Sequence, residues 1–106
     1  MAKIGTDIVQ VSRISLETSF LKKVLHQDEF NLLNDIIDLD SKKQFVAGRW
    51  AAKEAIFKVL NKNVAFNTIS IGYIKNKPVI LNNDLNTIEI SISHEKEYAI
   101  AVALNL

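Results

Sequence analysis

The sequence predicts a single α+β domain in which an N-terminal strand is followed by helices, and the chain ends in an antiparallel sheet. Apolar and polar residues alternate near the start, recur with helical spacing through the middle, and alternate again through the last third. Because most helices precede most strands, this order favours an α+β arrangement. A chain of 106 residues has room for one hydrophobic core, so residues 1–106 are expected to form one domain.

The expected elements, in chain order, are a strand over residues 3–10, helices over 14–25, 28–37 and 42–60, and strands over 69–73, 79–81, 88–93 and 98–104. In the first strand, alternation places Ile4, Thr6 and Ile8 on one face. The last strand alternates large apolar residues with alanines, so both of its faces are apolar and need cover.

Capping and turn residues set the expected boundaries. Asp28 is a suitable N-cap for the second helix, and Ser41 with Gln44 forms a capping-box pattern before the longest one. The Asn-Lys-Asn run at 61–63 ends that helix, and residues 75–78 are expected to form a turn between two strands.

Composition excludes several classes of protein. The net charge of +1 argues against a bulk nucleic-acid binder, and the absence of cysteine excludes disulfides, thiolate metal sites and cysteine nucleophiles. No apolar run approaches the roughly 18 residues of a membrane span, and the N-terminus lacks the apolar segment of a signal peptide. We therefore expect a cytoplasmic protein with no nucleic-acid or membrane partner.

The helix over 42–60 carries charges in unusual places. Arg49 and Lys53 fall in the middle of its apolar sector, while Glu54 and Lys58 lie on the opposite arc among alanines. Either the helix is enclosed on most sides, with its buried charges paired, or one charged side is a functional site. Glu54 and Lys58 could also be an ordinary surface pair one turn apart. Small neighbours suit the close approach of a ligand, which favours a site.

Asp7 is a second anomaly, because aspartate is depleted in strand interiors and this one lies within the first expected strand, before Ile8 and Val9. An aspartate on a strand and Glu54 on a helix form a natural pair of carboxylates for Mg²⁺, which completes its shell with phosphate oxygens and water. Lys58, one turn after Glu54, could neutralise such a phosphate. The alternative for Asp7 is a capping or turn carboxylate.

Ser93 and His94 stand at the end of the strand over 88–93, where a hydroxyl and an imidazole can bind an anion. A single histidine in a loop can also be simply exposed. Nucleophilic catalysis by this pair is disfavoured, because neighbouring strand residues point to opposite faces.

These residues fall within three segments of the chain, Gly5–Ile14, Phe45–Leu60 and Ser91–Ala101. In order and composition the three segments resemble the motifs of the holo-acyl-carrier-protein synthases, the small class of 4′-phosphopantetheinyl transferases. The chain departs from the family pattern over residues 61–78. The family usually has a glycine-rich turn and a Gly-x-Pro turn there, whereas this chain has asparagines in place of the glycines. Asparagine tolerates the left-handed backbone, so the turns can survive.

The resemblance implies transfer of the 4′-phosphopantetheine arm of coenzyme A to a serine of apo acyl carrier protein, in support of fatty acid biosynthesis. It implies that Asp7 and Glu54 bind Mg²⁺, with Lys58 completing the catalytic set and Glu54, or a water it orients, accepting the serine proton. The residues it implies for coenzyme A binding are Arg49, Lys53, Lys58, Ser93 and His94, with Arg49 and His94 the candidates for the 3′-phosphate. For Lys53 an internal ion pair is the alternative.

The resemblance also implies partners. Arg13, with Lys22 and Lys23 nearby, would dock the acidic carrier protein. The family forms homotrimers with sites between protomers, so Asp7, Glu54 and Lys58 would come from one protomer and His94 from its neighbour. Two other functions stay open: a metal-dependent phosphohydrolase acting on coenzyme A, and a non-catalytic nucleotide-binding module.

Overall fold

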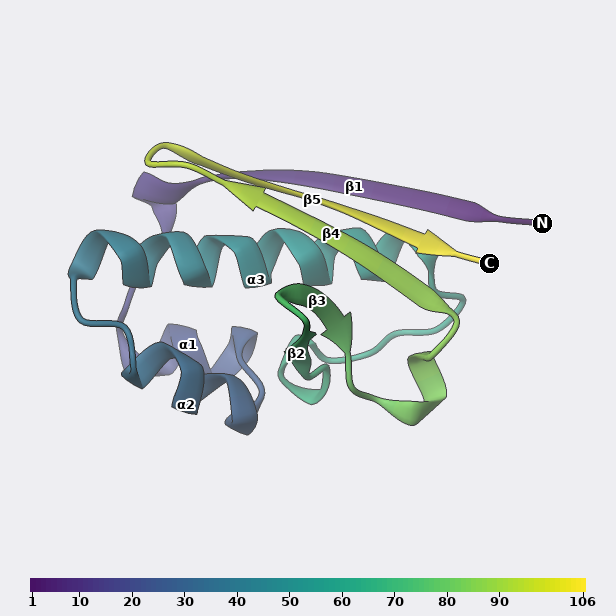
Figure 1. Ribbon diagram of the computed structural model, residues 1–106, viewed down its shortest axis with the longest axis horizontal. Coiled ribbons are helices and arrows are strands. Elements are labelled where there is room, and N and C mark those ends of the chain that lie inside the picture. The colour runs from purple at the N-terminus through teal and green to yellow at the C-terminus, as the bar shows by residue number, and fades with distance from the viewer.

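A three-stranded antiparallel sheet lies across one side of a long helix in the computed structural model, which describes residues 1–106 (Figure 1). The sheet order is β1-β5-β4, with β1 at Lys3–Gln10, β5 at Tyr98–Asn105 and β4 at Ile88–His94. The long helix is α3, Leu39–Val59. Its other side is covered by α1 (Thr18–Val24), α2 (Gln27–Asn34) and the hairpin of β2 (Ile71–Ile74) and β3 (Lys77–Ile80). The α+β class is confirmed.

Small residues let the sheet approach α3 closely. The buried face of β5 consists of Ala99, Ala101 and Ala103, and α3 contributes further buried alanines to the same core. On β1, Gly5 lies so near α3 that an added Cβ would collide with the carbonyl oxygen of Ala55. Close contact between backbones requires residues of this size.

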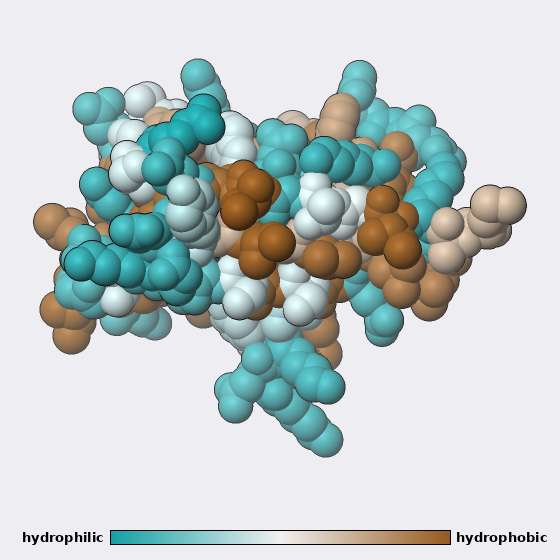
Figure 2. Space-filling view, turned by 90° about the horizontal axis from the view of Figure 1, so that it is seen from above, coloured by the Kyte–Doolittle hydropathy of each residue, from teal (hydrophilic) through white to brown (hydrophobic).

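The face shared by Ile4, Thr6 and Ile8 is the outer face of the sheet. Ile4 is 74% exposed and Ile8 is 61% exposed, whereas Gly5, Asp7 and Val9 point toward α3. On β5 the large residues also point outward, and Tyr98, Ile100 and Val102 are each exposed by 40% or more. Figure 2 shows apolar side chains gathered on this side of the molecule. The outer face formed by these five apolar residues of β1 and β5 is here called the apolar sheet face.

The helix boundaries differ from the expected ones. The expected helix over 14–25 is a 3₁₀ turn at Val11–Arg13 followed, after an extended stretch, by α1 from Thr18. The predicted cap Asp28 lies inside α2, because the N-cap is His26. Its Nδ1 accepts the backbone N–H of Asp28 at 3.0 Å, and Glu29 accepts the N–H of His26 at 2.8 Å. Histidine is not among the preferred N-caps, so sequence reasoning passed over it.

The long helix starts three residues earlier than expected, at Leu39. Its N-cap is Asp38, which accepts the backbone N–H of Ser41 at 2.9 Å. Hydrogen bonding from Ser41 holds the pKa of Asp38 below its usual value. The expected Ser41–Gln44 capping box is therefore wrong, although the helix itself is confirmed.

The turn expected at 75–78 is confirmed as the two-residue loop between β2 and β3. Lys75 and Asn76 have φ of 51° and 65°, both in the left-handed region that a tight hairpin turn requires. Asparagine supplies here the conformation for which glycine is the usual residue. No helix of the chain combines the length and the apolar character needed to cross a membrane.

We predict that Gly5→Ala destabilises the protein by about 3 kcal/mol, because the new methyl group meets backbone that cannot move aside. Gly72→Ala is the matched control, since its Cβ would meet only the side chain of Leu81, which is half exposed and can rotate. Its effect should stay within about 1 kcal/mol. Chemical denaturation of both variants measures the difference; equal effects would show that β1 and α3 are not closely packed.

Candidate functional site

Asp7 and Glu54 line one cleft between β1, α1 and α3. Asp7 points toward α3 because it shares the inner face of β1 with Gly5 and Val9. The cleft has a volume of about 430 Å³ and is lined by Asp7, Ile8, Val9, Arg13, Ile14, Phe20, Trp50 and Glu54. The alternative of a capping or turn role for Asp7 is wrong, since the residue lies inside β1, paired with Ala101.

The two carboxylates influence each other. Burial raises the pKa of Glu54, and the charge of Asp7 raises it further, while Lys58 acts in the opposite direction. Lys58 lies one turn after Glu54 on α3, and its Nζ donates to the carbonyl oxygen of Thr6 at 2.7 Å. The same Nζ is 3.7 Å from Oδ1 of Asp7. Two carboxylates and one cation therefore meet where β1 crosses α3.

This donor set fits a hard divalent cation. Asp7 and Glu54 offer only oxygen atoms. The repulsion between their negative charges, which contributes to the raised pKa of Glu54, is reduced when a cation binds between them. No group of three potential metal ligands occurs in the chain. Mg²⁺ is usually held by one or two carboxylates, with substrate phosphates and water in the remaining positions. Asp7 and Glu54 are the residues that would hold it.

An aromatic wall closes the cleft on the side of α1. Phe20 of α1 stacks on Trp50 of α3 with ring centroids 5.5 Å apart, and Phe66 meets Trp50 edge-on at 5.7 Å. Helical spacing in the sequence marks Phe20 and Trp50 only as apolar helix residues, because periodicity does not tell a cleft wall from a core. Arg13 is exposed at the rim of this cleft. Lys22 and Lys23 are exposed in the last turn of α1.

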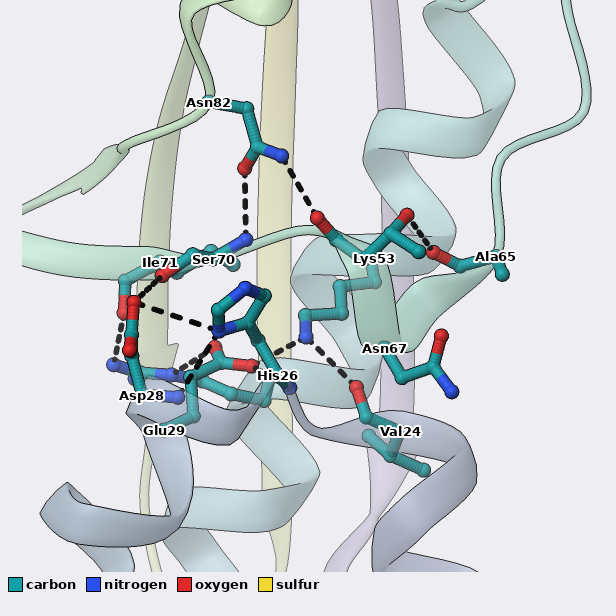
Figure 3. A network of polar contacts seen from close by, with 12 residues as sticks. Val24, His26, Asp28, Glu29, Lys53, Ala65, Asn67, Ser70, Ile71 and Asn82 are labelled. Carbon is teal, nitrogen blue, oxygen red and sulfur yellow. Dashed lines mark hydrogen bonds and ion pairs between the residues drawn. The ribbon is translucent and has the colours of Figure 1, made fainter.

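Arg49 and Lys53 belong to a buried cluster around Glu29, shown in Figure 3. Glu29 accepts from Arg49 Nε at 3.0 Å and from Lys53 Nζ at 2.5 Å. Arg49 is 2% exposed, and Lys53 and Glu29 are fully buried. Of the two alternatives for these cations, the structure therefore shows enclosure with paired charges. Sequence reasoning missed Glu29; its place three residues after His26, at N3 of α2, was the available signal.

His94 and Ser93 lie apart from the cleft. His94 Nδ1 is 2.9 Å from Gln44 Oε1, and His94 also lies near Gly48. Since Gly48 precedes Glu54 by six residues, His94 is displaced by roughly 9 Å along the axis of α3. Ser93 is exposed on the other face of β4. Within one chain, the structure brings together Asp7, Glu54 and Lys58 and leaves His94 and Ser93 elsewhere.

A family model for the 4′-phosphopantetheinyl transferase superfamily matches residues 3–103. The chain belongs to this superfamily. It is 50% identical over 101 residues to the holo-[acyl-carrier-protein] synthase of Mycoplasma capricolum, covering 95% of this chain and 91% of that protein. It is 37% identical over 108 residues to the same-named protein of Geobacillus sp., covering 92% and 90% of the two chains.

Solved structures agree. The chain is similar to a holo-(acyl-carrier-protein) synthase from Bacillus anthracis in complex with CoA (3′,5′-ADP), with a TM-score of 0.85, 32% identity and coverage of 95% and 92%. It is also similar to the Helicobacter pylori synthase in complex with coenzyme A, with a TM-score of 0.74, 30% identity and coverage of 95% and 97%. The family resemblance read from the three motifs is thereby confirmed.

We predict that Asp7→Asn lowers the pKa of Glu54 while leaving it above its ordinary value, because the neighbouring charge disappears and the burial remains. In the wild type, the folded chain holds the Glu54 proton to higher pH than the unfolded chain does. This contribution to the free energy of unfolding is fully present below the pKa that Glu54 has in the unfolded chain. It is lost as pH rises through the pKa that Glu54 has in the folded chain. Carboxyl ¹³C NMR titration measures the change. Asp84→Asn, at an exposed pair with Lys62, is the control and should leave Glu54 unchanged.

Proposed function

We propose that the chain transfers the 4′-phosphopantetheine group of coenzyme A to a serine of apo acyl carrier protein. The products are holo acyl carrier protein and adenosine 3′,5′-bisphosphate. The observation that carries this proposal is that Asp7 and Glu54 line one cleft, with Lys58 Nζ 3.7 Å from Asp7, in a chain of the 4′-phosphopantetheinyl transferase superfamily. Two relatives that are each 50% identical to this chain over 101 residues are holo-[acyl-carrier-protein] synthases.

The reaction is a phosphoryl transfer. The serine oxygen forms a bond to the β-phosphorus of coenzyme A, the bond from that phosphorus to the oxygen bridging to the nucleotide breaks, and the serine loses its proton. Such reactions depend mainly on positioning and on neutralising phosphate charge. Lys58 lies beside Asp7 with about half of its side chain exposed, so its ammonium group can pair with the pyrophosphate. Glu54 lies in the same cleft as Asp7 and is proposed to accept the serine proton directly or through a water that it orients.

Asp7 and Glu54 would hold Mg²⁺, which would supply charge neutralisation at the pyrophosphate. Arg49 and Lys53 are left out of the proposed coenzyme A site. Each would have to leave the buried pairing with Glu29 to reach a phosphate, and a separated buried charge is strongly unfavourable. His94, exposed at the end of β4, remains the candidate for the 3′-phosphate, with Ser93 beside it in sequence.

The carrier protein is proposed to dock across α1 and the end of β1. Arg13 stands at the rim of the cleft, and Lys22 and Lys23 are exposed in the last turn of α1. These three exposed cations suit an acidic partner and would speed its association at low salt.

A homotrimer is the proposed assembly, with the apolar sheet face covered by neighbouring protomers. Ile4, Ile8, Ile100, Val102 and Tyr98 make a continuous apolar surface on adjacent strands. Monomers rarely leave such surfaces open to water. His94 does not line the cleft that contains Asp7, which supports a site completed by His94 of a neighbouring protomer.

We predict that Asp7→Asn and Glu54→Gln each lower the rate of transfer by roughly 10²–10³, because charge stabilisation in the transition state is lost. Both changes keep side-chain shape, so circular dichroism should show an unchanged fold. The assay is mass spectrometry of apo carrier protein incubated with coenzyme A and Mg²⁺. A variant that keeps wild-type turnover at limiting Mg²⁺ contradicts the assignment.

The same incubation tests the two other functions. Release of the bisphosphate without carrier protein would indicate a phosphohydrolase. Binding of coenzyme A with neither product would indicate a nucleotide-binding module. Mass gain on the carrier, dependent on Mg²⁺, supports the transferase.

The shared site predicts complementation between inactive variants. Asp7→Asn and His94→Ala should each be weakly active alone. After unfolding and joint reassembly of an equal mixture, about a quarter of the sites in a closed three-fold ring should again be intact. Activity of the mixture, with native mass spectrometry to confirm mixed trimers, is the measurement. Mixed trimers without recovered activity would place His94 and Asp7 in sites of one chain.

A further inference from the structure

The carboxylate of Glu29 is paired with two cations where one would neutralise it. Its Oε2 accepts from Arg49 and its Oε1 accepts from Lys53, and no buried side-chain polar atom in the chain lacks a partner. With Arg49 alone the cluster would be neutral, and Lys53 adds a net positive charge in the core. Lys53 is fully buried, so its ammonium group is held away from water.

Added stability does not account for the second buried cation, Lys53. Taking a charge out of water is costly, and buried ion pairs are often no more stable than apolar replacements of similar size. What buried polar groups supply in some proteins is a defined arrangement of the elements that they join. The elements that each cation joins therefore indicate its structural role.

The two cations join different elements to α3. Arg49 donates to the Tyr73 hydroxyl at 2.9 Å and to the Ile71 carbonyl at 3.2 Å, so it holds the β2–β3 hairpin. Lys53 donates to the carbonyl oxygen of Val24 at 2.7 Å (Figure 3). Val24 is the last residue of α1.

The contact between Lys53 and Val24 matters because it ties the end of α1, a helix of only seven residues, to α3. The last carbonyls of a helix have no partner within it, and a cation there is favourable. A second donor to this turn, Asn67 Nδ2 at 3.1 Å from the Lys22 carbonyl, comes from the exposed side, where water can replace it. On the side of α3, Phe20 of α1 stacks on Trp50, and Leu21 and Val24 of α1 are buried in the hydrophobic core.

We propose that Lys53 is a positioning residue that fixes the carrier-docking helix α1 relative to Glu54. The inference rests on the proposed function, in which α1 receives the carrier protein. Lys53 and Glu54 are consecutive in α3, so the bond from Lys53 to the end of α1 sets the distance from the docking helix to the catalytic carboxylate. Arg49 neutralises Glu29 and holds the hairpin, and Lys53 holds α1.

The test is Lys53→Met, which keeps the length of the side chain, removes its charge, and leaves Glu29 paired one-to-one with Arg49. Tyr73→Phe is the matched control, because it removes one hydrogen bond from the same cluster on the hairpin side. For Lys53→Met we expect the KM for carrier protein to rise about tenfold or more, since small misplacements of reacting groups have large effects. The KM for coenzyme A should change less than about twofold, and Tyr73→Phe should leave both values near wild type.

A second readout uses the protein alone. Trp50 is the only tryptophan, and it stacks on Phe20 of α1, so its fluorescence reports the contact between α1 and α3. In Lys53→Met we expect red-shifted emission and stronger quenching by acrylamide, with Tyr73→Phe unchanged. If the wild type transfers nothing, the proposed function fails while this measurement still tests the position of α1.

Three results would overturn the positioning role. The first is unchanged emission together with unchanged KM for carrier protein. The second is an equal loss toward both substrates that follows the folded fraction measured by circular dichroism. The third is failure of both Lys53→Met and the shorter, neutral donor variant Lys53→Gln to fold, which would show that Lys53 supports the whole core.

Discussion

The close approach of α3 to the sheet is the contact on which the rest of the structure depends. Alanines on β5 and Gly5 on β1 allow the backbones to come together, and the collision that a Cβ at Gly5 would produce shows how little space remains. Close approach is what brings a strand carboxylate and a helix carboxylate to the same cleft. The raised pKa of Glu54 is an electrostatic consequence of that packing, because burial and the charge of Asp7 act together.

The charges on α3 are divided between two faces with different tasks. One face carries Arg49 and Lys53 into the cluster around Glu29, where every donor has a protein partner. The other carries Glu54 and Lys58 to the cleft, where solvent and substrate have access. A helix with charges on both sides is unusual for a surface helix. Charges occur on two faces of α3 because this helix is the central element, enclosed by the sheet on one side and by α1, α2 and the hairpin on the other.

Much of this arrangement could be predicted from local pattern. Alternation and helical spacing gave the order of the elements, and the rarity of aspartate in strands pointed to Asp7. What could not be predicted depends on contacts distant in sequence. Glu29 lies 20 residues from Arg49, so nothing local marks it as their shared partner. The cap His26 is likewise recognisable only with its partner Glu29 in place. Whether Phe20 and Trp50 form core or cleft depends on where β1 ends, which periodicity does not encode.

Side chains alternate along β1, which places residues of the cleft on one face of the strand and residues of the apolar sheet face on the other. Gly5, Asp7 and Val9 point toward α3, while Ile4 and Ile8 point outward to the apolar sheet face. A slip of one residue would turn the side chain of Asp7 outward and that of Ile8 toward α3, so both faces would be disrupted together. In the register against β5, Gly5, Asp7 and Val9 lie opposite Ala103, Ala101 and Ala99. A strand of eight residues thus contributes to the core, to the cleft and to the apolar sheet face.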